Sequence, residues 1–318
     1  MYAFVYMSIV NERYIVSGSR GYPALLAPLD DHPRRLFWQG AHPSSFPKPI
    51  AVIGTRSMTA YGAYATDFFV RGLVACGFCI VSGLALGVDG RAHEAALKYG
   101  GKTIGVLAGG LDQIQPATHI PLARQIVVSG GTLVSEFPCG TPPLKHRFRR
   151  RNRIIAGLSL GVLVVEAGER SGTHITAGFA AEYGRSVFAV SGPITSPYAD
   201  GIKALVNTGA KLVTTVQDIL EDLPSEYTTI SAEKTTDRNK EQQRLFADTQ
   251  QETPKARIIE IIQHSAPIDI DAIINQSTLS LSEVQRLVGE LELEGIIQRV
   301  GGGQYMPHER QNINEKMH

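Results

Sequence analysis

A basic run is the part of the sequence whose side chains are best suited to binding a charged ligand. Residues 145–153 contain six Lys or Arg, one aromatic residue and no acid. The whole chain has a formal net charge of +1, so the residues outside the run have a net charge of −5. Arginine guanidinium groups match phosphate oxygens, and Phe148 offers a face on which a base stacks. The combination favours single-stranded nucleic acid as ligand; the alternative is a solvated charged surface.

Four glycine-rich turns follow apolar runs, at residues 54–57, 82–87, 108–110 and 166–168. In open α/β sheets, ligands bind beyond the carboxyl ends of the strands. Glycine lets backbone N–H groups approach an anion, and the positive end of the following helix points at the same place. The repetition predicts phosphate-binding turns along one edge of a sheet, although tight turns alone would also explain the small residues.

Two nucleotide-binding motifs are incomplete. Gly101-Lys102-Thr103 is similar to the end of a P-loop, but Ala96 stands where the first glycine is needed, and the segment enters a strand instead of a helix. Residues 54–62 lack the G-x-G-x-x-G spacing of dinucleotide sites. We therefore predict no ATPase, no nicotinamide or flavin site, and no cofactor.

Four further side chains have types that support catalysis. Asp89 and His93 are four residues apart, and Glu136 and Glu166 each follow an apolar run. They are compatible with a carboxylate-assisted nucleotide hydrolase. The alternative is that Asp89 caps a helix and His93 packs beneath it. Because the sequence has no recognisable nucleophile–base pair or metal cluster, we predict no enzymatic activity and no metal.

The elements that position these residues follow from the apolar pattern. Most of the apolar runs do not alternate with polar residues, which is typical of strands buried on both faces. Helical segments at 66–74 and 91–99 separate several of them, so strands and helices alternate. This pattern predicts an α/β fold with a largely parallel sheet and helices on both faces. The expected strands are 50–53, 80–81, 103–107, 132–134, 162–165 and 187–190.

Cysteines and apolar segments bear on the cellular setting. The chain has three cysteines, and Cys76 and Cys79 lead into an apolar run, so we expect two buried structural thiols. Residues 1–10 are apolar but much shorter than the ~20 residues of a membrane span. We predict a cytoplasmic protein with no membrane association.

The motifs closely resemble successive blocks of the DprA/Smf family of DNA-processing proteins. The resemblance covers roughly residues 20 to 215 in order and spacing. It implies a Rossmann-like domain that dimerises, binds single-stranded DNA in a basic pocket, and delivers it to the recombinase RecA in natural transformation. The matching blocks are 53–56, 81–89, 101–107, 135–138, 151–159, 165–167 and 171–177.

The resemblance also implies which residues contact the DNA. Those carried over from the family are Gly54, Thr55, Arg56, Ser82, Gly83, Arg151, Asn152, Arg153, Ser171, Gly172 and Thr173. Lys145, Arg147 and Arg149 are added on the basis of charge and proximity.

The carboxyl-terminal part has a different composition. Residues 224–253 are polar and are predicted to form a linker. The linker joins a first domain at 1–223 to a second domain at 254–308, which is followed by a tail at 309–318. In the second domain we expect three helices and a hairpin, the pattern of a winged helix. Four basic against seven acidic side chains give it a net charge of −3. Such a surface repels phosphates, so we expect a protein-contact or regulatory role.

Two other functions fit parts of the sequence. One is a Rossmann-like hydrolase of phosphoribosyl type, which would use the carboxylates. The other is a transcription regulator that senses a nucleotide in the core and binds operators through the winged helix, against which the acidic third helix argues. We therefore expect a sequence-independent binder of single-stranded DNA that protects the strand and loads RecA.

Overall fold

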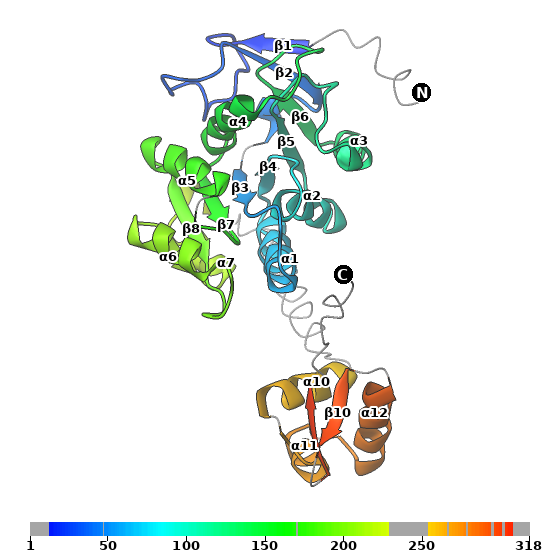
Figure 1. Ribbon diagram of the computed structural model, residues 1–318. Helices are drawn as coiled ribbons and strands as arrows, with labels where there is room; N and C mark the ends of the chain where they lie inside the picture. Colours follow the sequence, from blue (N-terminus) through cyan, green and yellow to red (C-terminus); the bar gives the residue numbers. More distant parts are fainter. Residues whose placement is uncertain are drawn as a thin grey trace, which may run out of the picture. The chain divides into compact units, whose positions relative to one another are not determined.

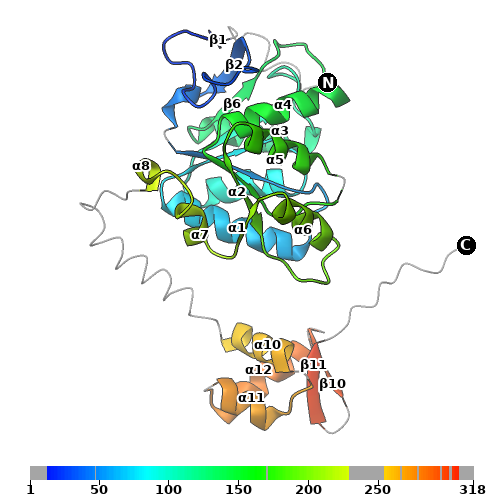
Figure 2. The same ribbon diagram turned by 90° about the vertical axis from the view of Figure 1, so that its left-hand side faces the viewer.

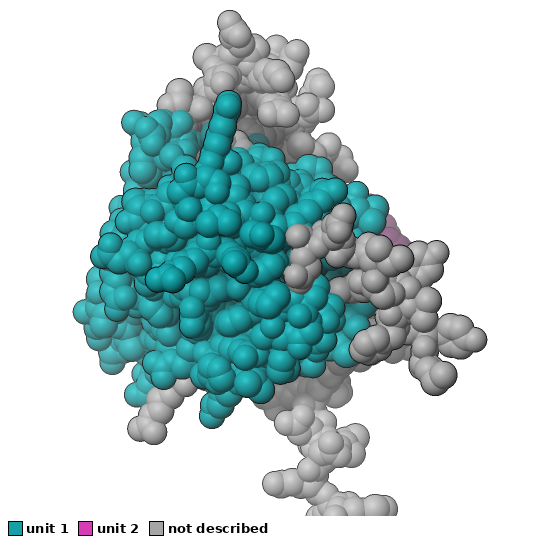
Figure 3. Space-filling model, turned by 90° about the horizontal axis from the view of Figure 1, so that it is seen from above, with its two compact units in different colours: residues 1–229 teal, residues 230–318 magenta. Residues whose placement is uncertain are grey.

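A computed structural model describes residues 13–46, 48–169, 171–228, 254–265, 267–277, 279–293, 296–300 and 303–307. The chain divides into two compact units, residues 1–229 and 230–318; Figure 3 colours the first unit teal. The expected tail and all but the first five residues of the expected linker lie outside the described residues. The domain boundaries therefore stay a prediction.

The described part of the first unit is built on a nine-stranded sheet (Figure 1) with the order β1-β2-β6-β5-β4-β3-β7-β8-β9. Strands β3 to β9 pair in parallel, whereas β1 and β2 form an antiparallel extension on β6. The strands are β1 (Arg13–Val16), β2 (Arg35–Gly40), β3 (Pro49–Ile53), β4 (Cys79–Ser82), β5 (Thr103–Leu107), β6 (Thr132–Ser135), β7 (Gly161–Val164), β8 (Ser186–Val190) and β9 (Lys211–Val213).

The central strands are buried on both faces, as their unbroken apolar sequences predict. Every residue of β3, β4, β5, β6 and β7 is buried. All six expected strands are present within one or two residues of the predicted bounds. The strands that sequence patterning did not predict are β1, β2 and β9, which lie toward the edges of the sheet.

Helices cover both faces of the sheet (Figures 1 and 2), which confirms the predicted Rossmann-like α/β fold. Side chains of α1, α2, α3 and α7 pack on one face, and those of α4, α5 and α6 on the other. The helices are α1 (Ala60–Ala75), α2 (Val88–Lys98), α3 (Ile120–Val128), α4 (Lys145–Gly157), α5 (Gly172–Glu182), α6 (Ala199–Asn207), α7 (Val216–Leu220) and α8 (Ser225–Thr228).

The direction in which successive strands are added reverses at β3. From β3 the chain adds β4, β5 and β6 on one side, then returns through α4 to add β7, β8 and β9 on the other. Crevices for ligands form beyond the carboxyl ends of the strands at such a reversal. The β3–α1 loop, α4 and the start of α5 all lie next to this reversal of strand order.

The second unit is a winged helix, as predicted. It consists of α10 (Pro254–Ser265), α11 (Ile270–Ser277), α12 (Leu281–Leu293) and the antiparallel pair β10 (Ile297–Val300) and β11 (Gln304–Pro307). Its core is mostly isoleucine and leucine, with Ile258, Ile273 and Leu291 fully buried. Glu290 forms ion pairs with both Lys255 and Arg286, so two of the four basic side chains are already paired.

None of the three cysteines, all of which lie in the described part of the chain, forms a disulfide. Burial raises the pKa of Cys76 and, more strongly, that of Cys79, so both remain protonated at neutral pH. Cys79 is buried as predicted, whereas the prediction that Cys76 is buried as well is wrong, because Cys76 is only half-buried. Among the described residues, no helix is both long and apolar enough to cross a membrane.

Candidate nucleic-acid interface

The loop that follows β3 is fixed to the neighbouring strand end at two points. The Thr55 N–H donates to the backbone oxygen of Glu166 (2.8 Å). The buried Glu166 carboxylate accepts from the Thr59 N–H (3.0 Å) and hydroxyl (2.5 Å). Between these anchors Arg56 is exposed. Its backbone is therefore held in place while its guanidinium faces solvent.

Tyr198 braces the same loop from the start of α6. Its hydroxyl accepts from the Thr55 hydroxyl (3.3 Å) and donates to the Ser57 backbone oxygen. These contacts flank Arg56 on both sides along the chain. Sequence reasoning did not identify Tyr198, because a single tyrosine some 140 residues away carries no local signal of this contact.

Helix α4 places Phe148 beside two arginines. The Arg56 guanidinium carbon lies 5.5 Å from the centre of the Phe148 ring, and that of Arg151 lies 5.9 Å from it. Cations within about 6 Å of an aromatic ring are attracted to its face. Arginines from two distant segments of the chain thus meet at one aromatic side chain.

Arg151 itself is an internal residue. It is 4% exposed, and its Nη1 donates to the backbone oxygens of Gly83 and Val106, both at 2.5 Å. Burial lowers the pKa of Arg151 to about 10, and Arg56 acts in the same direction, while Asp89 opposes both. The expected contact between Arg151 and DNA is therefore corrected: its guanidinium ties α4 to the ends of β4 and β5.

Ser82 and Gly83 also form hydrogen bonds within the protein. The buried Ser82 hydroxyl donates to the Val52 backbone oxygen (2.7 Å), and the Gly83 N–H donates to the Asp89 carboxylate (3.1 Å). Neither group is directed at a ligand, which corrects their predicted role. Asp89 does not cap its helix either, because the N-cap residue of α2 is Gly87.

The glycines of these turns are required by packing. A Cβ atom on Gly83 would lie 2.5 Å from Nη1 of Arg151, and one on Gly54 would lie 2.6 Å from Cγ2 of Val88. Both contacts are shorter than van der Waals separation allows. Tight packing therefore accounts for Gly54 and Gly83, the alternative that the sequence left open.

His93 and Asp89 are enclosed beneath the loops. His93 is fully buried, and its Nδ1 lies 2.6 Å from the Thr103 hydroxyl. Burial, followed by His119 and Arg151, lowers the pKa of His93 to about 3, so the ring is neutral. Burial raises the pKa of Asp89, and Arg151 counteracts the rise. Neither side chain faces solvent, which disfavours acid–base catalysis by this pair.

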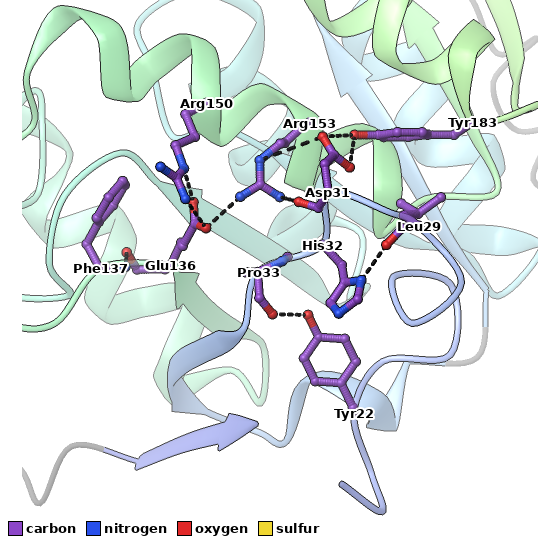
Figure 4. Close-up of polar contacts among 11 residues, drawn as sticks. Tyr22, Leu29, Asp31, His32, Pro33, Glu136, Phe137, Arg150, Arg153 and Tyr183 are labelled. Carbon is purple, nitrogen blue, oxygen red and sulfur yellow. Dashed lines mark hydrogen bonds and ion pairs between the residues drawn. The ribbon is translucent and has the colours of Figure 1, made fainter. Parts of the chain in front are cut away.

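Arg153 contacts Glu136 and Asp31 (Figure 4), not the strand ends that hold Arg151. Its Nη2 donates to Glu136 (2.6 Å), and its Nη1 donates to the backbone oxygen of Asp31. Arg150 binds the same Glu136 through two hydrogen bonds of 2.8 and 2.9 Å. Arg153 is 7% exposed. The expected contact between Arg153 and DNA is therefore corrected, because its guanidinium is held in this internal ion pair.

The exposed charges of the basic run lie on the first turns of α4. Lys145 and Arg149 are exposed, and neither forms an ion pair with any residue that the structure describes. Arg147 is half-buried: its guanidinium lies 5.1 Å from the Phe137 ring centre and donates to the Pro142 backbone oxygen. Lys145 and Arg149 are therefore better placed than Arg147 to bind a phosphate.

The start of α5 completes the site. The Asn152 side-chain amide donates to the Gly172 backbone oxygen (3.3 Å), which links α4 to α5. Ser171 is the N-cap of α5, and its hydroxyl accepts from the Thr173 N–H (3.2 Å). Thr173 is buried, whereas Gly172 is exposed. Of the predicted turn, Gly172 and Ser171 remain accessible.

We refer to the accessible residues gathered at this point as the Arg56 surface. They come from the β3–α1 loop, the outer side of α4 and the start of α5. The Arg56 surface consists of Arg56, Lys145, Phe148, Arg149, Asn152, Ser171 and Gly172. In the described parts of the chain, no group of three or more His, Cys, Asp or Glu side chains is arranged to hold a metal ion.

Comparison with known proteins places the chain in a family. The family model described as DNA recombination-mediator protein A matches residues 13–224, and that of the DprA winged helix domain matches residues 240–303. The chain belongs to the DprA/Smf family. The family resemblance seen in the sequence motifs is thereby confirmed.

Individual relatives agree with this assignment. Protein Smf of Escherichia coli is 46% identical over 213 residues, which cover 67% of this chain and 57% of that relative. DNA processing protein DprA of Bacillus subtilis is 44% identical over 65% of this chain and 69% of its own length. Protein Smf of Synechocystis is 32% identical over 93% of this chain and 80% of its own length.

Two solved DprA structures share the fold. DNA processing protein A of Streptococcus pneumoniae has a TM-score of 0.63 and 42% identity, over 67% of this chain and 75% of that one. DNA processing protein A of Helicobacter pylori, described for its single-stranded DNA binding mode, has a TM-score of 0.59 and 29% identity, over 67% of this chain and 99% of its own.

Proposed function

We propose that the first unit binds single-stranded DNA on the Arg56 surface without reading its sequence. The observation that carries the proposal is the contact of Arg56 with Phe148 at the reversal of strand order, next to the unpaired Lys145 and Arg149. Fixed cations beside an aromatic face suit a phosphate chain with unstacked bases. The binding mode named for the Helicobacter pylori relative supports the same ligand class.

The binding is non-catalytic in this proposal. The two groups best suited to acid–base chemistry, Asp89 and His93, are 7% and 0% exposed and are bonded within the protein. A phosphoribosyl-type hydrolase would need at least one of them at the surface. Their burial therefore favours a DNA-binding role over this alternative.

Membership of the DprA/Smf family supports the wider role. We propose that the protein acts in the cytoplasm as a homodimer, protects incoming single-stranded DNA in natural transformation, and loads RecA onto it. The acidic second unit is proposed to contact protein partners, because its net negative charge opposes binding to phosphates.

The test uses two double variants of the full chain with equal loss of charge. Arg56→Ala with Arg149→Ala removes two cations of the Arg56 surface. Arg71→Ala with Arg124→Ala removes two from α1 and α3, on the other face of the sheet. Fluorescence anisotropy with labelled oligo(dT) should show at least about a tenfold loss of affinity for the first variant only. Equal affinities of the two variants would refute the proposal.

Binding should also weaken with salt, by about 0.7 logarithmic units of affinity per tenfold rise in salt for each phosphate that the protein neutralises. The first variant should therefore have a slope about 1.4 smaller than wild type. An unchanged slope with lower affinity would indicate that these side chains act through folding instead of through binding to phosphates.

A further inference from the structure

A second cleft opens on the side of α4 away from Phe148. Arg150 follows Phe148 by two residues, and successive residues of a helix are rotated by about 100°, so the two side chains leave α4 on nearly opposite sides. The cleft has a volume of about 730 Å³. The lining residues that matter here are Arg34, Arg35, Glu136, Phe137, Arg150 and Arg153.

The lining of this cleft has an excess of positive charge. Two carboxylates face four arginines, which leaves a net charge of +2. Glu136 forms ion pairs with Arg150 and Arg153 (Figure 4). The Tyr183 hydroxyl donates to the Asp31 carboxylate, whose two oxygens lie 2.7 and 2.8 Å away, and Nε of Arg153 lies 4.0 Å from that carboxylate. Both acids are therefore neutralised or bonded, and the excess charge comes from the remaining arginines.

Arg34 and Arg35 supply that excess from a fixed backbone. Both are exposed, and neither forms an ion pair within the described residues. The preceding Pro33 is buried, and its backbone oxygen accepts from the Tyr22 hydroxyl at 2.6 Å. The Arg34 backbone oxygen accepts from the Ser17 N–H at 3.0 Å. The backbone that carries the two guanidinium groups is thus held by hydrogen bonds, and no carboxylate of the described residues pairs with either group.

The cleft also has an aromatic side chain with an arginine beside it. The Phe137 N–H donates to the Ser135 hydroxyl (3.0 Å), which fixes the start of the loop after β6. Arg147 lies 5.1 Å from the Phe137 ring centre. The Arg56 surface has the same combination in Arg56 and Phe148. Each side of α4 therefore presents an arginine–aromatic pair next to unpaired cations.

The part of the Arg56 surface that lies nearest to the cleft is basic as well. By helical rotation, Lys145 and Arg149 leave α4 between the directions of Phe148 and Arg150. Both are exposed. A phosphate chain that leaves the Arg56 surface toward the cleft therefore passes two exposed cations that form no ion pair with any described residue.

We propose that this cleft is a second DNA subsite, which receives the continuation of the strand held at the Arg56 surface. This inference rests on the proposed function. Arg34 and Arg35 bind phosphates there, and Phe137 provides a stacking face for a base. Because α4 is about 10 Å across, a strand of two or three nucleotides is used up in passing around the helix and cannot occupy both sites. The cleft therefore contributes to the affinity for long strands only.

The test compares oligo(dT) of about 3 and about 20 nucleotides, which lie below and above the roughly 4–16 nucleotides that single-strand-binding folds cover. Arg34→Ala with Arg35→Ala should weaken binding of the long strand about five- to tenfold and lower its salt slope by about 1.4. Binding of the short strand should change by less than about twofold. The Arg71→Ala, Arg124→Ala variant is the control with equal charge loss and should leave both affinities unchanged.

The outcomes separate this inference from the proposed function. If the wild-type protein binds neither strand, the proposed function fails. If wild type binds both strands and the Arg34, Arg35 variant matches it on the long one, the second subsite is refuted. An equal loss on the short and long strands also refutes it, because the cleft would then not be a continuation of the first site.

Discussion

Replacing Arg151 by alanine tests whether the buried arginine is a structural support of the DNA site. The change leaves the Asp89 carboxylate buried without its counter-charge and removes the donor to the Gly83 and Val106 backbone oxygens. Removing one partner of a buried charge pair costs about 3–5 kcal/mol of unfolding free energy. For a unit of this size that lowers the melting temperature by about 6–20 °C.

The assay is urea unfolding followed by tryptophan fluorescence. The chain has a single tryptophan, Trp38 in β2, so the signal reports the first unit alone. Arg149→Ala is the matched control: it removes an exposed arginine from the same helix and should cost less than about 0.5 kcal/mol. Adding Asp89→Asn to the Arg151 variant should restore part of the loss, because no uncompensated charge then remains.

The loss should depend on pH. Burial raises the pKa of Asp89 above the usual 3.8, and removing Arg151 raises it further. A carboxyl group with a higher pKa in the folded state stabilises the fold when protonated, and that contribution is lost as pH rises through the folded pKa. The deficit of the Arg151 variant is therefore largest at neutral pH and shrinks toward pH 4. A loss below about 1 kcal/mol at neutral pH, or one that grows on acidification, would rule out this structural role of Arg151.

Three further predictions concern single side chains and the second unit. Phe148→Leu should weaken single-stranded DNA binding by about 1–3 kcal/mol with an unchanged salt slope, measured by anisotropy, because it removes a stacking face and no charge. Tyr198→Phe should lower affinity about threefold by loosening the loop that carries Arg56, and an unchanged affinity would show that this brace is dispensable. Full-length protein and a chain ending at residue 228 should bind duplex DNA equally weakly in gel shifts; a marked loss on truncation would assign duplex binding to the winged helix.

The layout of the fold could be predicted because its signals are local. Uninterrupted apolar strands such as β3 and β5 indicate burial on both faces, and the glycine turns that follow them mark the carboxyl edge. The antiparallel strands β1 and β2 gave no such signal. β2 pairs with β6, whose residues are nearly a hundred positions away, and among the described strands β1 pairs only with β2.

The site was predicted in place but not in detail. Charge density identified α4, yet it did not distinguish Arg149, which is exposed, from Arg151 and Arg153, which are buried. Helical rotation separates their directions, but their partners come from other elements: Asp89 lies in α2, and Glu136 follows β6. Only the folded chain shows that these arginines are internal supports, and that Arg34 and Arg35 stand at the surface.

Photo-crosslinking would locate the bound strand on the protein without relying on changes in affinity. Oligo(dT) bound to the full-length protein is irradiated, and the crosslinked residues are identified by mass spectrometry. We expect crosslinks to Phe148 and neighbouring residues of α4, which disappear when Arg56 and Arg149 are replaced by alanine. Crosslinks confined to residues 254–307, or an α4 pattern that persists in that variant, would mean that the Arg56 surface does not hold the DNA.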